Sequence, residues 1–189
     1  MAIKPPPIQE KVFDATGLFP QRWVIWFNAL KDFINSSIYW FDYNNSLASI
    51  SHTGGGTTYL TNDGAGVYSA SYNASGFPDI WDTTANEFNF SSLAIGDVVT
   101  IRADLIVATA VNNQEFKIVY DMAIGSGSDY SLNATDRYFK AISTYNITSV
   151  FTFYIGNEIT KNYPAKIRFD SVDNATITVN GWFVKIDRV

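Results

Sequence analysis

Residues 97–109 read DVVTIRADLIVAT, and their pattern is the clearest indication of the fold. Apolar side chains recur at every second position and share one face: Val99, Ile101, Ala103, Leu105 and Val107. Polar side chains occupy the opposite face: Thr100, Arg102 and Asp104. Because successive side chains of a strand point to opposite faces, this period of two predicts a strand with one buried face.

The same alternation continues through the second half of the chain. It recurs in Gln114–Ile124, and the intervening Val111-Asn112-Asn113 predicts a hairpin connection between the two strands. Further strands are predicted over Ile147–Ile155, Ala165–Phe169 and Thr176–Val189. In the last of these the apolar positions slip by one residue at Gly181, which predicts a β-bulge.

Residues 36–82 are rich in Ser, Thr, Gly, Asn and Tyr, with turn signals at Gly54-Gly55-Gly56 and Asn62-Asp63-Gly64. Short strands are expected around these turns, over residues 38–41, 47–51, 57–61 and 66–71. Together the patterns predict a mainly β fold: an antiparallel, jelly-roll-like β-sandwich of about eight to ten strands.

Residues 1–35 follow a different pattern. A Pro-rich leader, Met1–Pro7, precedes a helix predicted over residues 20–34, with Pro20 in a first turn where its missing N–H is no loss. The helix carries an apolar stripe at steps of three and four: Trp23, Trp26, Phe27, Leu30, Phe33 and Ile34. We therefore expect an N-terminal arm and anchor helix over residues 1–35. A β-sandwich domain follows over residues 36–189, loop-rich over 36–85 and regular over 86–189.

The apolar stripe must be covered, because a short helix gains most of its stability from packing. Three surfaces could cover it: the sandwich of the same chain, two sister helices, or a host structure. Sheet edges and the outward aromatic residues Tyr154 and Phe183 also need cover. These features favour a homotrimer.

Composition excludes several classes of protein. The net charge is −5 and the basic residues are scattered, which argues against a nucleic-acid partner. No run approaches the roughly 18 apolar residues of a membrane span, so no membrane partner is expected. The start lacks the apolar stretch of a signal peptide, so export would need another route, such as lysis. With no cysteines there is no disulfide or thiol chemistry.

Catalytic and metal-binding patterns are weak. His52, the only histidine, lies in a polar turn and is interpreted as a solvated loop residue. One histidine without cysteine does not make a zinc site, and residues 62–64 and 133–136 are interpreted as turns rather than calcium loops. Glu115 is expected on a solvent face and Glu158 in a turn, so no facing carboxylate pair stands out. We expect no enzyme activity, no cofactor and no metal.

Aromatic residues in loops could instead stack on sugar rings, since flat apolar faces with polar rims suit carbohydrate. The candidates for glycan contact are Tyr59, Tyr68, Tyr72, Trp81, Tyr130 and Tyr145. The alternative is that each of them packs a loop onto the sandwich.

Two stretches carry a resemblance. The leader Ile3-Lys4-Pro5-Pro6-Pro7, then Gly17-Leu18 and Trp23-Val24-Ile25-Trp26-Phe27-Asn28-Ala29-Leu30, resembles the N-terminal segment of small tailed-bacteriophage structural proteins. The segments 153–158 (FYIGNE) and 180–186 (NGWFVKI) are similar to the closing strands of phage fibre, head-fibre and decoration-type proteins. The resemblance covers both ends of the chain and little of residues 36–82.

The resemblance implies a virion component, a homotrimer whose leader docks into the particle while the sandwich faces outward. Such a protein is made in the host cytoplasm and released by lysis. The anchor is expected to comprise Pro5, Pro6, Pro7, Trp23, Trp26, Phe27 and Leu30.

The leading hypothesis is a non-enzymatic phage structural protein: a tail-associated fibre, knob or receptor-binding component that contacts other virion proteins and a host-surface glycan. One alternative is a capsid decoration or cement protein, present in far more copies. Two further alternatives are a free carbohydrate-binding module and a small glycan hydrolase.

Overall fold

The computed structural model describes residues 6, 20–35, 38–72 and 77–189. The backbone divides into two compact units, residues 1–38 and 39–189. The first unit contains helix α1, Gln21–Asn35, which confirms the predicted helix. The Pro20 carbonyl accepts the first helical hydrogen bonds, from the backbone N–H groups of Trp23 and Val24. Pro5 and Pro7 lie outside the described residues.

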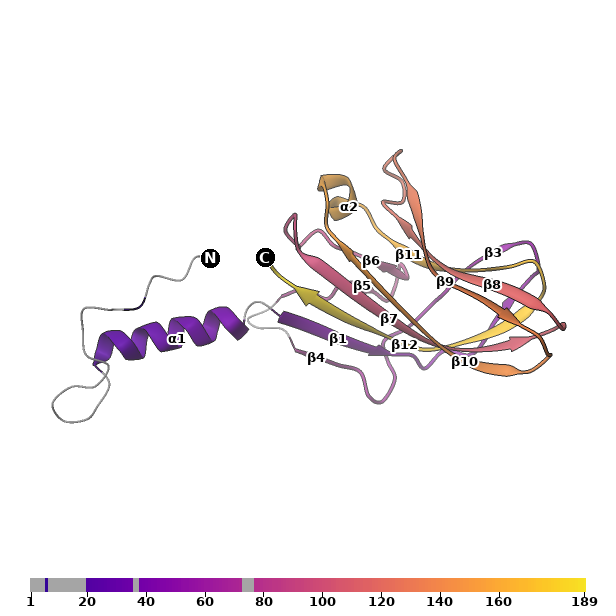
Figure 1. Ribbon diagram of the computed structural model, residues 1–189, viewed down its shortest axis with the longest axis horizontal. Coiled ribbons are helices and arrows are strands. Elements are labelled where there is room, and N and C mark those ends of the chain that lie inside the picture. Colours follow the sequence, from indigo (N-terminus) through magenta and orange to yellow (C-terminus); the bar gives the residue numbers. More distant parts are fainter. Residues whose placement is uncertain (1–5, 7–19, 36–37, 73–76) are drawn as a thin grey trace. The chain divides into compact units, whose positions relative to one another are not determined.

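The second unit consists mainly of antiparallel strands in two main sheets (Figure 1). The six-stranded sheet has the order β10 (Thr144–Tyr154), β7 (Val98–Thr109), β12 (Ala175–Asp187), β1 (Ile38–Asn44) and β4 (Ala70–Tyr72), with β2 (Ile50–His52) also paired to β12. The four-stranded sheet has the order β3 (Thr57–Tyr59), β11 (Lys166–Ser171), β8 (Gln114–Met122) and β9 (Tyr130–Phe139). Strands β5 (Trp81–Asp82) and β6 (Glu87–Phe88) pair with each other, and helix α2 (Glu158–Asn162) follows β10.

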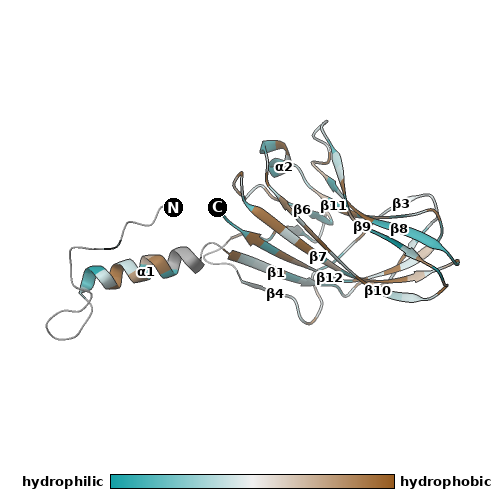
Figure 2. Cartoon of the chain, viewed as in Figure 1, coloured by the Kyte–Doolittle hydropathy of each residue, from teal (hydrophilic) through white to brown (hydrophobic). Residues whose placement is uncertain are grey.

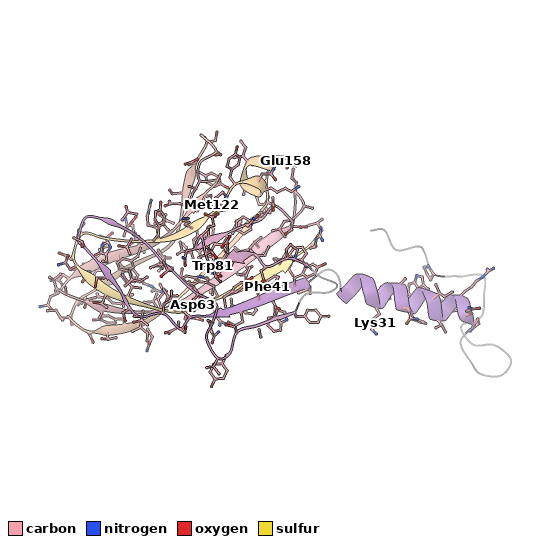
Figure 3. All side chains as sticks on the ribbon, turned by 180° about the vertical axis from the view of Figure 1, so that it is seen from behind. Lys31, Phe41, Asp63, Trp81, Met122 and Glu158 are labelled. Carbon is pink, nitrogen blue, oxygen red and sulfur yellow. The ribbon has the colours of Figure 1, made fainter. Side chains whose placement is uncertain are left out.

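The core lies between the two main sheets, and all five apolar residues of the 97–109 pattern are buried in it. From the opposite sheet, β8 contributes Phe116, Ile118, Tyr120 and Met122. Brown positions along β7 show its apolar content in Figure 2, and Phe41 and Trp81, labelled in Figure 3, are buried in the sandwich. Full burial of one large apolar side chain contributes about 1.5–3 kcal/mol. The chain is therefore the antiparallel β-sandwich that the sequence predicts.

The hairpin predicted at residues 111–113 is wrong. Strand β7 pairs with β10 and β12, whereas β8 pairs with β9 and β11, so residues 111–113 cross from one sheet to the other. The buried side chain of Gln114 holds this crossing. Its Oε1 accepts from the Ala110 N–H, and its Nε2 donates to Ser171 Oγ and to the carbonyls of Asp173 and Asn174. A local turn signal cannot show which sheet the next strand joins.

The β-bulge predicted at Gly181 is confirmed. The register between β12 and β7 shifts between Val179 and Gly181, and Trp182 then turns into the core. A Cβ atom at position 181 would lie 2.7 Å from the Tyr43 carbonyl oxygen. Glycine is thus required by the close approach of β1, as well as by the bulge.

Two further elements differ from expectation. Residues 133–136, interpreted as a turn, lie within strand β9, which pairs with β8 through a register shift between Ile118 and Val119. Glu158, expected in a turn, begins the short helix α2, whose N-cap Asn157 accepts a hydrogen bond from the Thr160 N–H. β9 escaped detection because Asn133 and Asp136 disfavour strands in isolation, and only pairing with β8 overrides that preference.

Two buried tyrosines allow a stability test. The Tyr43 hydroxyl accepts from the N–H groups of Ile80 and Trp81, whereas the Tyr120 hydroxyl has no hydrogen-bond partner among the described residues. We expect Tyr43→Phe to lower the free energy of unfolding by about 2 kcal/mol, because two buried donors lose their acceptor. Tyr120→Phe is expected to leave it unchanged or raise it by about 1 kcal/mol. Urea denaturation checks both, and equal losses would contradict this account.

The same variants test alkaline stability. Burial raises the pKa of both hydroxyls above the ordinary value of 10.0. The unfolded chain therefore loses these protons first as the pH rises, so the stabilisation is complete below pH 10 and declines above it. We expect each Phe variant to show a shallower decline than the parent chain in urea denaturation above pH 10.

Candidate functional site

The aromatic residues of α1 form a compact cluster within the first unit. The ring centroids of Trp23 and Trp26 lie 5.9 Å apart, those of Trp23 and Phe27 5.8 Å, and those of Trp26 and Phe27 5.1 Å. At 100° per residue, Val24 lies beside Phe27, whereas Ile25 falls on the far side of the helix together with the polar residues Gln21 and Asn28. Val24 and Ile25 are 43% and 59% exposed. The helix is therefore amphipathic, with the exposed Ile25 among polar residues, while the side chains of Phe33 and Ile34 lie outside the described residues.

The six candidate glycan contacts do not converge on one platform. Trp81 is contradicted as a surface contact: it is 3% exposed, packs against Trp182, and donates its indole N–H to the Asn62 carbonyl. Tyr145 stacks on Phe139 with ring centroids 3.8 Å apart and donates to the Ala141 carbonyl. Trp81 and Tyr145 therefore pack against other parts of the sandwich, as predicted by the alternative to glycan contact.

The remaining four candidates are exposed but scattered over the second unit. Tyr130, at the start of β9, has its hydroxyl 2.9 Å from Thr160 Oγ1 of α2. Tyr68 and Tyr72 belong to the turn before β4 and to β4 itself. Tyr59, 44% exposed on β3, lies on the outer face of the four-stranded sheet, directly opposite Arg168.

The outward aromatic residues of the six-stranded sheet have different surroundings. Phe183 neighbours Trp40 at 6.1 Å between ring centroids, and the Arg102 guanidinium lies 5.4 Å from the Phe183 ring. Trp40 in turn lies 6.5 Å from Tyr72. Phe183 is therefore partly covered within the chain, while Tyr154 is exposed.

A groove of about 480 Å³ lies on the outer face of the four-stranded sheet. Alternation creates it: Ile167 and Phe169 of β11 point into the core, so Arg168 and Asp170 between them point outward. In the same way β8 presents Glu115 and Lys117. Sequence reasoning assigned Glu115 to the solvent face, which is confirmed, but missed the groove because its strands come from distant segments.

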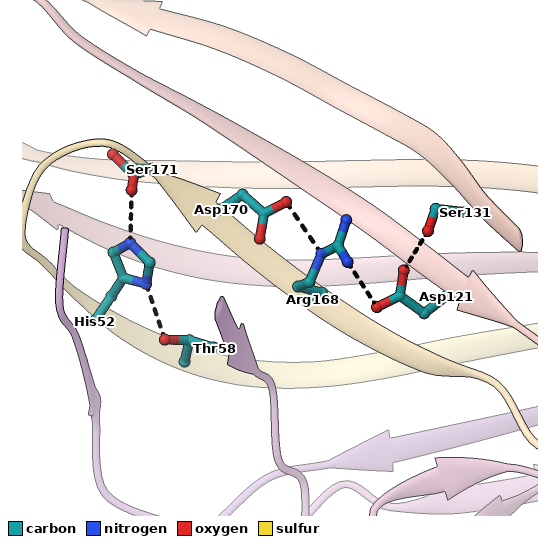
Figure 4. Close-up of polar contacts among 7 residues, drawn as sticks. All are labelled: His52, Thr58, Asp121, Ser131, Arg168, Asp170 and Ser171. Atoms are coloured by element: carbon teal, nitrogen blue, oxygen red, sulfur yellow. Dashed lines mark hydrogen bonds and ion pairs between the residues drawn. The ribbon is translucent and has the colours of Figure 1, made fainter. Parts of the chain in front are cut away.

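Arg168 joins two carboxylates across this face (Figure 4). Its Nη1 donates to Asp121 Oδ2 at 3.0 Å, and its Nε lies 3.0 Å from Asp170 Oδ2. Asp121 Oδ1 accepts from Ser131 Oγ at 2.6 Å. Desolvation raises the pKa of Tyr59, and a hydrogen bond with the Asp121 carboxylate raises it further. The network fixes the guanidinium in one position.

Lys117 forms a second network beside the first. Its Nζ lies 3.5 Å from Glu115 Oε1 and 3.6 Å from Asp136 Oδ2, and these carboxylates raise the pKa of the ammonium group, Asp136 the more strongly. Each cation of the groove is thus matched by carboxylates. Exposed pairs of this kind contribute little to stability.

His52 is not a solvated loop residue, which corrects the interpretation from sequence. It is 3% exposed; its Nε2 lies 3.0 Å from the Ser171 carbonyl oxygen and its Nδ1 2.8 Å from Thr58 Oγ1 (Figure 4). Because a carbonyl only accepts, Nε2 carries the hydrogen, and in the neutral ring Nδ1 accepts from Thr58. His52 therefore joins β2, β3 and the end of β11, next to residues 55–57 of the groove wall.

Within the described ranges, no three His, Asp or Glu side chains are grouped so that they could hold a metal ion. Asn62-Asp63-Gly64 is a hydrogen-bonded turn, in which Asn62 Oδ1 accepts from the Gly64 N–H. Neither described helix has the length and continuous apolar character needed to cross a bilayer. The groove can therefore bind through side-chain donors and acceptors, with the Tyr59 ring next to its lining residue Arg168.

No protein-family model matches the chain, and no curated protein matches it. Solved structures with a similar fold include a chain of the T13 infectious bursal disease virus particle, with a TM-score of 0.47 and 10% identity over 80% of this chain and 31% of that one. This chain therefore spans about a third of that viral chain. Another is the CBM22-1 xylan-binding domain of Paenibacillus barcinonensis Xyn10C (TM-score 0.40, 9% identity, 79% and 94% covered). A third is the Eiger TNF of S. frugiperda (TM-score 0.38, 6% identity, 80% and 92% covered).

His52 provides a test of the groove wall. We expect His52→Phe to lower the free energy of unfolding by about 2 kcal/mol, since two buried hydrogen bonds are lost while a ring remains next to Phe169. Thr58→Val removes only one of them, so a loss of about 1 kcal/mol is expected. Urea denaturation measures both losses. A His52→Phe variant as stable as the parent would contradict the role of His52 in joining β2, β3 and the end of β11.

Proposed function

We propose that this chain is a non-enzymatic structural protein of a tailed-phage virion. In this proposal it is a homotrimeric fibre, knob or receptor-binding component associated with the tail. The N-terminal arm docks onto other virion proteins, and the β-sandwich of residues 39–189 faces outward as the part that meets the host surface. The chain is made in the host cytoplasm and leaves with the particle on lysis.

One observation carries the proposal: α1 leaves large apolar side chains exposed. Phe27 of the aromatic cluster is 41% exposed, and Val24 and Ile25 are 43% and 59% exposed. A short helix gains most of its stability from packing its apolar side chains against a partner. A docking socket or a bundle of sister helices provides that packing.

The resemblance of the N-terminal and C-terminal segments to phage structural proteins supports the phage assignment. The Trp23–Leu30 segment that resembles phage N-terminal segments is the apolar part of α1. The segment 180–186 contains the confirmed bulge and the core residue Trp182. Both similar stretches thus coincide with defined structural elements, one in each unit.

Exposed Ile25 offers a test of docking that spares the fold. We expect Ile25→Ser to reduce incorporation into particles about tenfold, because an apolar contact of the socket is lost. Asn28→Ser, a polar change at an exposed position of the same helix, is the matched control. Particles assembled with each variant in place of the parent chain are purified, and the copies per particle are counted by quantitative immunoblotting.

Deletion of residues 1–37 tests docking more stringently in the same incorporation assay. We expect the shortened chain to fold, as judged by circular dichroism, and to be absent from particles. Normal incorporation of this folded product would overturn the anchoring role. Parent copies in the hundreds per particle would favour the capsid decoration alternative over a tail component.

The trimer is tested by mass. We expect the purified full chain to have three times the mass of one chain in light scattering. The deletion of residues 1–37 separates two possibilities: a mass of one chain after deletion places the trimer contacts in the first unit, and an unchanged mass places them on the sandwich. A full chain that is monomeric at all concentrations contradicts the trimer.

A further inference from the structure

The groove on the outer face of the four-stranded sheet has no excess positive charge. Arg168 is matched by Asp121 and Asp170, and Lys117 by Glu115 and Asp136. A phosphate, sulfate or carboxylate ligand would have to displace one of these carboxylates from its cation. The ion pairs therefore disfavour anionic ligands, and because each of the four carboxylates already has a cationic partner, a polar neutral ligand fits better than a cationic one.

The backbone in the middle of this face is already paired. β11 lies between β3 and β8, and its N–H and C=O groups bond to both neighbours. A peptide that binds as an added strand needs a free sheet edge, so it would find no backbone partners over β11 and β8, and could add only outside β3 or β9. A ligand can therefore reach only side chains here: the donors and acceptors of the ion-pair networks and the Thr57 hydroxyl. Neighbouring hydroxyl groups of a sugar can donate to such acceptors and accept from such donors.

Exposed tyrosines stand at the two edges of the same face. Tyr59 lies on β3 opposite Arg168, and Tyr138 lies on β9 opposite Glu115. The Lys166 ammonium is 5.9 Å from the Tyr59 ring and also contacts Glu87. Three strand spacings separate β3 from β9, about 14 Å, a span longer than one sugar ring.

We propose that this groove binds a neutral oligosaccharide, with Tyr59 as the stacking ring and Asp170, Arg168 and Lys117 as the hydrogen-bonding partners of its hydroxyls. Charged side chains held by one another make strong, oriented hydrogen bonds with hydroxyl groups. The aromatic ring meets the apolar face of the sugar. Tyr59, a candidate named from sequence, stands beside the groove, opposite its lining residue Arg168.

Binding to the purified full chain provides the test. The probes are immobilised neutral gluco-, galacto- and manno-oligosaccharides, with sialylated and uronate-containing oligosaccharides and an extended Ser/Thr-rich peptide alongside. We expect retention on neutral oligosaccharides only. Asp170→Asn and Tyr59→Ala should each weaken that binding about tenfold, because one removes a charged acceptor and the other the stacking ring.

Matched controls lie on the opposite sheet. Asp104 pairs with Arg102 Nε at 2.9 Å and is 32% exposed, compared with 3.0 Å and 33% for Asp170 beside Arg168. Asp104→Asn therefore changes a similar ion pair outside the groove, and Tyr154→Ala removes an exposed tyrosine of β10. Both should bind as the parent does, and thermal denaturation confirms that all four variants are folded.

Three outcomes overturn the proposal: no retention on any neutral oligosaccharide at millimolar concentration, retention that Asp170→Asn and Tyr59→Ala leave unchanged, or preference for the acidic oligosaccharides or the peptide. The assay needs no particle, so its failure leaves docking through α1 intact. Loss of docking would likewise leave glycan binding intact. Only the role of the groove as a receptor contact rests on the proposed function.

Discussion

Alternation of side chains across a strand is the constraint on which this structure depends. In β11, Ile167 and Phe169 are buried between the sheets, so Arg168 and Asp170 must face solvent. The core and the groove are thus two faces of the same strands. A shift of register by one residue would place charges in the core and phenyl rings in the groove, so the packing that stabilises the sandwich also fixes the position of the candidate site.

Buried polar groups hold the parts that alternation alone leaves undetermined. Gln114 bonds the crossing between the sheets to the turn before β12, and His52 joins the end of β2 to β3 and to the end of β11. Such groups are costly to bury without partners. Each of these two side chains has its partners, and each lies at the end of a strand, next to a connection. The shape of the groove therefore depends on hydrogen bonds made by loops as well as on the sheet.

The two units contribute different properties to the proposed function. α1 exposes the apolar side chains of Val24, Ile25 and Phe27 within a short segment, which suits docking in an assembly. The sandwich provides a face of matched charges and exposed tyrosine, which suits recognition of a polar neutral surface. A virion protein that attaches at one end and contacts its host at the other needs both properties in one chain.

Local pattern was sufficient for those features that depend on neighbouring residues only. The period of two in residues 97–109 predicted the buried strand, the steps of three and four predicted α1, and the slip at Gly181 predicted the bulge. Each is a property of a few consecutive side chains, so it could be predicted from the sequence alone.

Tertiary structure decided which strands pair and which side chains meet. From sequence, residues 111–113 are predicted to form a hairpin, His52 to be solvated and Trp81 to contact a glycan. In the structure, residues 111–113 join two sheets, and His52 and Trp81 are buried. The pairing of Arg168 with Asp121 brings together residues forty-seven positions apart. The reason is physical: sheet pairing and burial are set by the free energy of the whole fold, to which distant segments contribute as much as adjacent ones.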